Sequence, residues 1–283
     1  MPRRITKMNS FNGVAAGSTA TLDCPVDRRY HQLVLEYKHA GALANQATIE
    51  SHITAIRIRL NGILQREYRG TKVLNAINAL NGVPFKAGMI PIFFSEPWRR
   101  NAVNEDELAW ALEGNVSTFQ VEVDIDGAAL TPELKAYAVT DNARRANGAM
   151  IPLTGIVKLL PTVVSVSAAG KVAITTLPKT NTYMRLHCQE GVANDITEVD
   201  ISIDQLAVYQ QTRERNAWWL DQQGMVPQTG FFHVAFDATQ RISDGLPMVR
   251  ADGRAVSEFL CEFTLANANN FTIHAELVGN PNI

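Results

Sequence analysis

The order of residues in the first half of the chain recurs in the second half, and this repeat limits the fold more strongly than any other feature. The run Ala15-Ala16-Gly17 recurs as Ala168-Ala169-Gly170, 153 positions later. Four more pairs keep that offset: Ala20 and Ala173, Pro25 and Pro178, Tyr30 and Tyr183, Leu33 and Leu186. Because glycine and proline mark turns with demanding backbone angles, finding them twice in one order indicates an internal duplication.

Later segments extend the repeat at slightly smaller offsets. Three matched pairs follow one another: 54–60 with 197–203 at an offset of 143, 82–94 with 224–236 at 142, and 117–125 with 257–265 at 140. A helical pattern follows the first of these strands in both halves. We therefore expect each half to fold into the same unit.

Short segments with alternating side chains predict a chain built mostly of β-strands. Isoleucine and leucine alternate with arginine over 56–60, and residues 119–125 alternate apolar and polar side chains in the same way. Such alternation is typical of strands with one buried and one solvated face. In the first half, strands are predicted at 19–24, 30–37, 53–60, 88–94, 116–125 and 134–139.

Short helices interrupt the strands, and a polar linker separates the halves. Thr71 is predicted to cap a helix that stops at Gly82, and Thr212 a helix that stops at Gly224. Residues 141–151 are polar, rich in glycine and alanine, and without periodicity. The predicted fold is all-β, with two tandem jelly-roll sandwiches (a double jelly roll) and short embedded helices. The N-terminal jelly roll is assigned to 1–148 and the C-terminal one to 149–283.

Composition favours a folded protein made in a reducing compartment. Hydrophobic residues make up 46% and charged residues 19%, and the net charge of −2 gives no basic field for wrapping nucleic acid or recognising its sequence. Cys24, Cys188 and Cys261 form no CxxC pair and are predicted to be free thiols. No apolar region follows the basic N-terminal residues, so no secretory signal is expected. Prolines and a lysine interrupt the most apolar stretch, 151–166, so no membrane span is expected either. We expect synthesis in the cytoplasm.

The motifs of common enzyme classes are missing from the sequence. The six histidines include no HxH or HxxxH pair, and His187 and His233 are predicted to be buried or at a sheet edge. No nucleophile elbow and no glycine-rich phosphate loop occurs. Asp124 and Asp126 share one face of a strand end, where either a calcium ion or a solvated face fits the pattern. The chain is predicted not to be an enzyme and to hold no cofactor, with structural calcium left open.

Two features are candidates for a binding role. Arg3, Arg4 and Lys7 form a basic N-terminal segment that fits contact with acidic lipid headgroups or phosphate, or a disordered tail. The long segments 95–114 and 237–255 correspond by the repeat and are predicted to emerge from the same end of the two sandwiches.

Four runs of the first half resemble a known family. They are NSFNGVAAGSTATLDCPVDRRY, AIRIRLNG, FKAGMIPIFF and FQVEVDIDGAALTPELKAYA. In this order and spacing the chain resembles the major capsid protein of corticoviruses, which are tailless icosahedral bacteriophages with an internal membrane. The likeness covers most of the first half, and the second half agrees only in its strand pattern.

The resemblance implies a viral structural protein that self-assembles. It implies homotrimers with a pseudo-hexagonal outline that contact neighbouring capsomers and vertex or minor capsid proteins. Such trimers form the icosahedral capsid of the virion around an internal viral membrane and genome, after synthesis in the host cytoplasm. It also implies calcium at subunit contacts, without assigning ligands to this chain.

Two other classes of protein remain open on the residues alone. A tandem jelly-roll carbohydrate-binding or host-attachment protein could use Trp98, Trp110, Trp218 and Trp219 to line sugar sites. Trp218 and Trp219 are neighbours on a predicted helix, so only one of them can face a given surface. The third class is a bicupin-like enzyme, which would require a bound metal.

Overall fold

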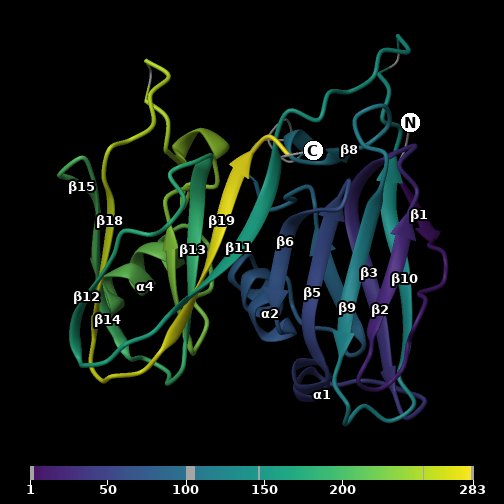
Figure 1. The fold of residues 1–283 in the computed structure, drawn as a ribbon, viewed down its shortest axis with the longest axis horizontal. Helices are drawn as coiled ribbons and strands as arrows, with labels where there is room; N and C mark the ends of the chain where they lie inside the picture. The colour runs from purple at the N-terminus through teal and green to yellow at the C-terminus, as the bar shows by residue number, and fades with distance from the viewer. Residues whose placement is uncertain (1–2, 100–105, 146, 251, 282–283) are drawn as a thin grey trace. The chain divides into compact units, whose positions relative to one another are not determined.

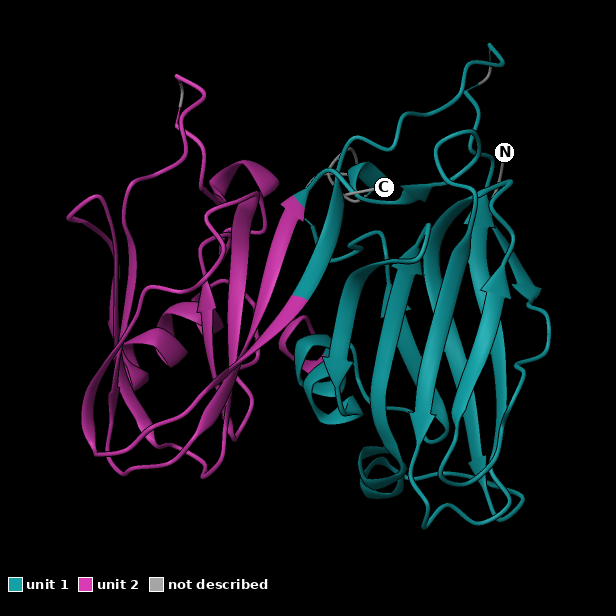
Figure 2. Cartoon of the chain, in the orientation of Figure 1, with its two compact units in different colours: residues 1–78, 83–159, 279–283 teal, residues 79–82, 160–278 magenta. Residues whose placement is uncertain are grey.

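The chain folds into two compact β-rich units in the computed structural model (Figure 1), which describes residues 3–99, 106–145, 147–250 and 252–281. The first unit comprises 1–78, 83–159 and 279–283, and the second comprises 79–82 and 160–278 (Figure 2). The sequence assigned the boundary to 148/149, whereas the division by spatial contacts falls between Leu159 and Leu160.

The first unit is a sandwich of two sheets. One sheet runs β1-β10-β3-β4, with β7 and β8 also paired to β3, and the other runs β2-β9-β5-β6 and continues to β11. The elements are β1 (Arg4–Lys7), β2 (Thr19–Cys24), β3 (Arg29–His39), β4 (Ala42–Leu43), α1 (Gln46–His52), β5 (Ile53–Leu60), β6 (Ile63–Arg69), α2 (Thr71–Leu80), β7 (Met89–Phe93), β8 (Trp110–Ala111), β9 (Phe119–Ile125), β10 (Glu133–Asp141) and β11 (Ile156–Val164).

The second unit has the same two-sheet plan. One sheet runs β12-β18-β14-β15, and the other runs β16-β13-β19-β11, with β17 paired to β13. Residues 156–159 of β11 belong to the first unit and residues 160–164 to the second. The remaining elements are β12 (Gly170–Ile174), β13 (Thr182–Glu190), β14 (Ile196–Ile203), β15 (Leu206–Thr212), α4 (Arg213–Gln222), β16 (Phe231–Ala235), η1 (Ile242–Asp244), β17 (Leu246–Pro247), β18 (Phe259–Leu265) and β19 (Phe271–Gly279).

Strand registers confirm the internal repeat. In the first unit Leu33 pairs with Ile92, and in the second Leu186 pairs with Val234, at the predicted offsets of 153 and 142. The β5–β6 and β14–β15 hairpins also match, down to an irregularity after Ile58 in one and after Ile201 in the other. A strand pairing fixes which side chains are buried, so two identical registers require two equivalent cores.

The two hairpin turns repeat the same side-chain chemistry. Asn61 follows β5 with φ 47°, and its Oδ1 accepts hydrogen bonds from the amides of residues 117 and 118 at 2.8 and 3.1 Å. Asp204 follows β14 with φ 49°, and its Oδ1 accepts from the amides of residues 257 and 258, both at 2.9 Å. Asparagine and aspartate tolerate this left-handed backbone because their short polar side chains bond locally.

Both embedded helices end with the same pattern of hydrogen bonds. Gly82 has φ 77° and Gly224 has φ 78°, which glycine adopts without strain. The amide after each glycine donates to a carbonyl five residues earlier, from Val83 to Asn78 and from Met225 to Leu220, at 2.9 and 3.0 Å. These are glycine-terminated helix ends of the kind that the sequence predicted.

Two details of the sequence prediction are wrong. The first is the register of strand β12. Ala20 pairs with Val123, and Val172 pairs with Phe263, which is the equivalent of Val123 at the offset of 140. Ala20 therefore corresponds to Val172 and not to Ala173, one residue away from the predicted match. Ala173 is accordingly exposed and Ala20 buried. Thr71 does not cap α2, because it is the first helical residue and its buried hydroxyl has no hydrogen-bond partner in the described part of the chain. The cap predicted at Thr212 is confirmed, since its hydroxyl accepts from the Arg215 amide.

A tyrosine anchors the first long strand of each unit, and this pair gives a matched test of the repeat. Tyr30 Oη donates to the Pro25 carbonyl at 2.6 Å, and Tyr183 Oη donates to the Pro178 carbonyl at 2.7 Å. Both tyrosines are fully buried. We expect Tyr30→Phe and Tyr183→Phe each to lower the free energy of unfolding of its own unit by about 1–2 kcal/mol, because a buried carbonyl loses its donor. Hydrogen exchange read out separately for each unit measures both losses, and a loss in one unit alone would contradict their equivalence.

The cysteines are free, as predicted, and all three are buried. Burial raises the pKa of Cys24 and of Cys261 to about 12, which keeps both thiols protonated at neutral pH. In the part of the chain that the structure describes, no helix has the length and apolar character needed to cross a membrane.

Candidate functional site

The basic N-terminal segment is an ordered edge strand rather than a disordered tail from Arg4 onward. Strand β1 pairs antiparallel with β10, which places Arg4 opposite Thr140 and Lys7 opposite Tyr137. Since side chains alternate along a strand, Arg4 and Lys7 lie on opposite faces of the sheet. Arg3 forms an ion pair with Asp106 at 2.5 Å. The structure therefore does not gather the three predicted basic residues into one cluster.

Strands β1, β10, β3 and β7 together present a half-exposed face, here called the outer face of the first unit. Its side chains lie in cross-strand rows, each row contributing one residue from each strand. Ile5 at its edge is 78% exposed. The first row is Ile5, Val139, Gln32 and Phe93, and the second is Lys7, Tyr137, Val34 and Pro91. Apolar side chains with scattered charges make this face suitable for contact with another protein surface.

The corresponding strands of the second unit carry buried ionisable residues on the same face. Arg185 and His187 on β13 occupy the positions of Gln32 and Val34, and both are fully buried. His187 has His233 on β16 and His274 on β19 as its cross-strand neighbours. Because the burial of charge is costly, such residues require specific partners.

Arg185 and Asp237 form a buried ion pair. The Arg185 guanidinium donates from Nε to Asp237 Oδ1 at 2.8 Å and from Nη2 to Oδ2 at 3.0 Å. Its Nη1 donates to Asn81 Oδ1 at 2.9 Å. The ion-paired side chains are 1% and 0% exposed. This bidentate geometry is the arrangement in which a buried arginine and a carboxylate satisfy each other most completely.

His187 and His233 form a buried pair of imidazoles. Their Nδ1 atoms lie 2.9 Å apart, and His187 Nε2 lies 3.2 Å from Glu276 Oε2. Burial lowers the pKa of His187 to about 3, and the charge of Arg185 adds to that effect. Burial and the neighbouring His187 hold the pKa of His233 well below its usual value. One Nδ1 must donate and the other accept, so the accepting ring must be neutral. The prediction that both histidines are buried is confirmed.

The predicted calcium candidates are engaged in other contacts. Asp124 accepts two hydrogen bonds from Arg57, at 2.6 and 2.7 Å, and one from Thr19 at 2.6 Å. Burial raises the pKa of Asp124, but the Arg57 and Thr19 bonds outweigh it and leave the pKa below its usual value. Asp126 Oδ1 accepts from the Ala128 amide. Among the described residues, no group of three or more His, Cys, Asp or Glu side chains is suited to hold a metal.

The four tryptophans line no common site. Trp110 is fully buried and packs against Phe94 with ring centroids 4.5 Å apart. Trp98 contacts Phe93 edge-on. On α4, Trp218 is 60% exposed while Trp219 packs against the cluster around Leu220, so the two do face different surroundings.

Comparison with solved structures defines the fold. The crystal structure of the major capsid protein P2 from bacteriophage PM2 superposes with a TM-score of 0.83 at 20% identity, covering 98% of this chain and 97% of that one. The STIV MCP crystal structure gives 0.72 at 11% identity over 99% and 98%. A quasi-atomic model of the PBCV-1 virus capsid gives 0.67 at 10% identity over 98% and 93%. The chain therefore has the predicted double jelly-roll fold that these capsid proteins share.

Comparison with family models then identifies the protein family. The family model for the viral coat protein P2 N-terminal domain matches residues 5–141, and that for the C-terminal domain matches 156–281. The chain belongs to the viral coat protein P2 family. This confirms the resemblance seen in the first half and extends it to the second, which sequence inspection matched only in strand pattern.

One curated relative also matches in sequence. Major capsid protein P2 of Pseudoalteromonas phage PM2 is 30% identical over 142 residues, which is 48% of this chain and 49% of that protein. The match thus spans about half the length of the relative. These comparisons favour the structural role predicted from the sequence over the carbohydrate-binding and bicupin alternatives.

Proposed function

We propose that this chain is a major capsid protein whose homotrimers tile an icosahedral bacteriophage shell around an internal membrane and genome. The duplicated sandwich carries the proposal: three chains supply six similar units, which fit a pseudo-hexagonal tile. Membership of the coat protein family supports the same role. The protein would be made in the host cytoplasm and function in the virion.

The outer face of the first unit supports self-association. It exposes Ile5 and half-buries Val34, Tyr137 and Phe93 across four strands, whereas the matching face of the second unit is buried. Closed trimers would cover such a face and shield edge strand β1. Neighbouring capsomers and vertex or minor capsid proteins would use the remaining surface.

Electron microscopy of the purified protein tests the proposal. We expect three-lobed particles with a near-hexagonal outline. Particles the size of a single chain, seen at micromolar concentration and physiological salt, would contradict it. We propose that any structural calcium ion binds between copies of the chain and not at Asp124, whose carboxylate is held by Arg57 and Thr19. Particles that keep their form in a chelator would argue against it.

The proposal gives the basic N-terminal segment a role in contacting the phosphate of acidic lipids beneath the shell. Lys7 and Arg4 are exposed on strand β1, and Arg3 keeps 41% of its side chain exposed beside Asp106. We expect the triple alanine variant of Arg3, Arg4 and Lys7 to bind phosphatidylserine vesicles more weakly and with a smaller salt dependence. Neutral phosphatidylcholine vesicles are the control. Equal vesicle binding by the wild type and the variant would show that the segment does not contact lipid. If the wild type instead bound DNA and no vesicles, the segment would contact the genome.

A further inference from the structure

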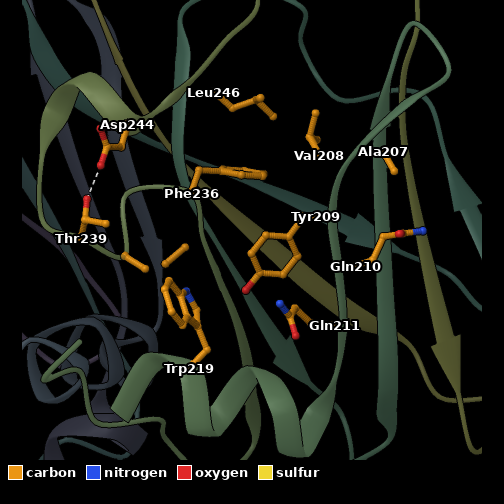
Figure 3. Close-up of a pocket in the computed structure, with 12 residues that line it drawn as sticks. Ala207, Val208, Tyr209, Gln210, Gln211, Trp219, Phe236, Thr239, Asp244 and Leu246 are labelled. Atoms are coloured by element: carbon orange, nitrogen blue, oxygen red, sulfur yellow. Dashed lines mark hydrogen bonds between the residues drawn. The ribbon is translucent and has the colours of Figure 1, made fainter. Parts of the chain in front are cut away.

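The second unit contains a groove of about 470 Å³ between strand β15 and the end of β16 (Figure 3). Tyr209 from β15, Trp219 from α4 and Phe236 point toward it, and Thr239 bonds Asp244 at its far side. The Oε1 atom of Gln211, also in the lining, is buried and has no hydrogen-bond partner among the described residues. The groove is therefore aromatic with an unsatisfied acceptor in its wall, and this combination is typical of binding sites.

The internal repeat shows what occupies the equivalent place in the first unit. Strand β6 corresponds to β15, because Arg66 pairs with Ile58 as Tyr209 pairs with Ile201. One edge of β6 pairs with β5, and the start of β11 covers the other edge, where Leu159 pairs parallel with Arg66. The space alongside β6 is thus filled by an extended segment of the chain.

The contacts of that segment define its chemistry. Arg66 donates from Nε to the Val157 carbonyl and from Nη1 to the Phe93 carbonyl, both at 2.6 Å. Phe93 corresponds to Ala235 of the groove at the offset of 142. Ile156, Val157 and Leu159 are buried, with exposures of 0%, 6% and 2%. The occupant is a short extended peptide that buries β-branched and leucine side chains alongside β6.

Strand β15 has no such neighbour in the described part of the chain. It ends its sheet and pairs only with β14, and Leu206 at its start is 70% exposed. An unpaired strand edge beside an apolar groove accepts an added strand through main-chain hydrogen bonds, while side-chain pockets give selectivity.

We infer that the groove between β15 and β16 binds an extended apolar segment of a different polypeptide, lying parallel to β15 as the start of β11 lies along β6. A second copy of this chain is not the donor of the matching segment, because its own residues 156–159 are buried within its first unit. The donor carries two adjacent β-branched residues, followed after one residue by leucine or a similar side chain. The inference rests on the repeat and does not require that the chain build a shell.

A labelled synthetic peptide with the sequence of residues 154–160 (TGIVKLL) is the probe, titrated into the purified full-length protein. Fluorescence anisotropy is expected to show saturable binding of one peptide per chain. A peptide of the same sequence with N-methylated backbone should bind at least tenfold more weakly, since it cannot extend the sheet. Equal binding of the two peptides, or no binding up to millimolar concentration, would overturn the inference.

A groove-filling variant locates the binding. Ala207 lines the groove and is exposed, so Ala207→Trp should fold normally while occupying the space. We expect at least tenfold weaker peptide binding, with Trp218→Ala as the matched control because Trp218 is exposed and outside the lining. Unchanged binding by Ala207→Trp would place the peptide elsewhere. Light scattering of the same samples separates the remaining case: if Ala207→Trp alters the oligomeric state, copies of the chain cover the groove and the separate-partner inference fails.

Discussion

Asp237→Asn is expected to lower the free energy of unfolding of the second unit by about 3–5 kcal/mol, because it removes the carboxylate charge from a buried bidentate ion pair with Arg185. The Arg185 side chain is 1% exposed, so water does not replace the lost carboxylate charge, and the hydrogen bond from its Nη1 to Asn81 is to a neutral amide. Asp200→Asn is the control in the same unit, since its partner Lys171 is 56% exposed, and it should cause no measurable change. Denaturant titration followed by hydrogen exchange measures both variants.

The first unit supplies a way to test whether the charge itself causes the loss. At the positions of Arg185 and Asp237 the first unit has Gln32 and Ser95, which carry no charge. The double variant Arg185→Gln with Asp237→Ser should therefore recover a large part of the stability lost in Asp237→Asn. If the single variant loses less than about 1 kcal/mol, or if the double variant is less stable than the single one, the buried charge does not dominate this contact.

Acidification is expected to destabilise the second unit as the pH falls below about 6.5, where an unfolded histidine begins to take up a proton. The folded-state pKa of His187 is about 3 and that of His233 is well below its usual value, so the unfolded chain binds more protons throughout this interval. Stability is therefore fully present above pH 6.5 and is lost progressively toward pH 3. Neighbouring charges act in opposite directions: Arg185 lowers the pKa of both histidines and Arg213 lowers that of His233, whereas Asp237 raises that of His187.

Urea midpoints of the second unit between pH 7 and pH 4 measure this effect. The variant His233→Gln should flatten the pH dependence, because one of the two buried imidazoles no longer titrates. His31→Gln is the comparison in the first unit: burial lowers the pKa of His31, but Asp141, 3.2 Å from its Nε2, opposes that shift. A pH dependence that His233→Gln leaves unchanged would show that the histidine pair is not its origin.

The sequence was sufficient for the architecture because glycine, proline and tyrosine report specific backbone requirements. Gly82 and Gly224, and likewise Tyr30 and Tyr183, occupy equivalent places in the two halves of the repeat. Alternation alone was less dependable. Ala173 was matched to Ala20 although the strand is shifted by one residue, and a shift of one residue exchanges the buried and exposed faces of a strand.

The buried contacts of the second unit could not be predicted, because they depend on pairing between strands that are distant in the chain. Arg185 and Asp237 are 52 positions apart, and His187 and His233 are 46 positions apart. The sequence did contain a signal for the ion pair, because the repeat aligns Arg185 with Gln32 and Asp237 with Ser95, so that two opposite charges in the second half stand where the first half has none. The groove beside β15 was equally hidden, since it is recognised only by comparison with the filled position beside β6.

The mass of the purified protein in solution tests most directly whether the duplicated sandwich exists to fit against copies of itself. Multi-angle light scattering at micromolar concentration and physiological salt should give a particle of three 31.1 kDa chains. A particle of one chain, unchanged as the concentration rises, would contradict the account.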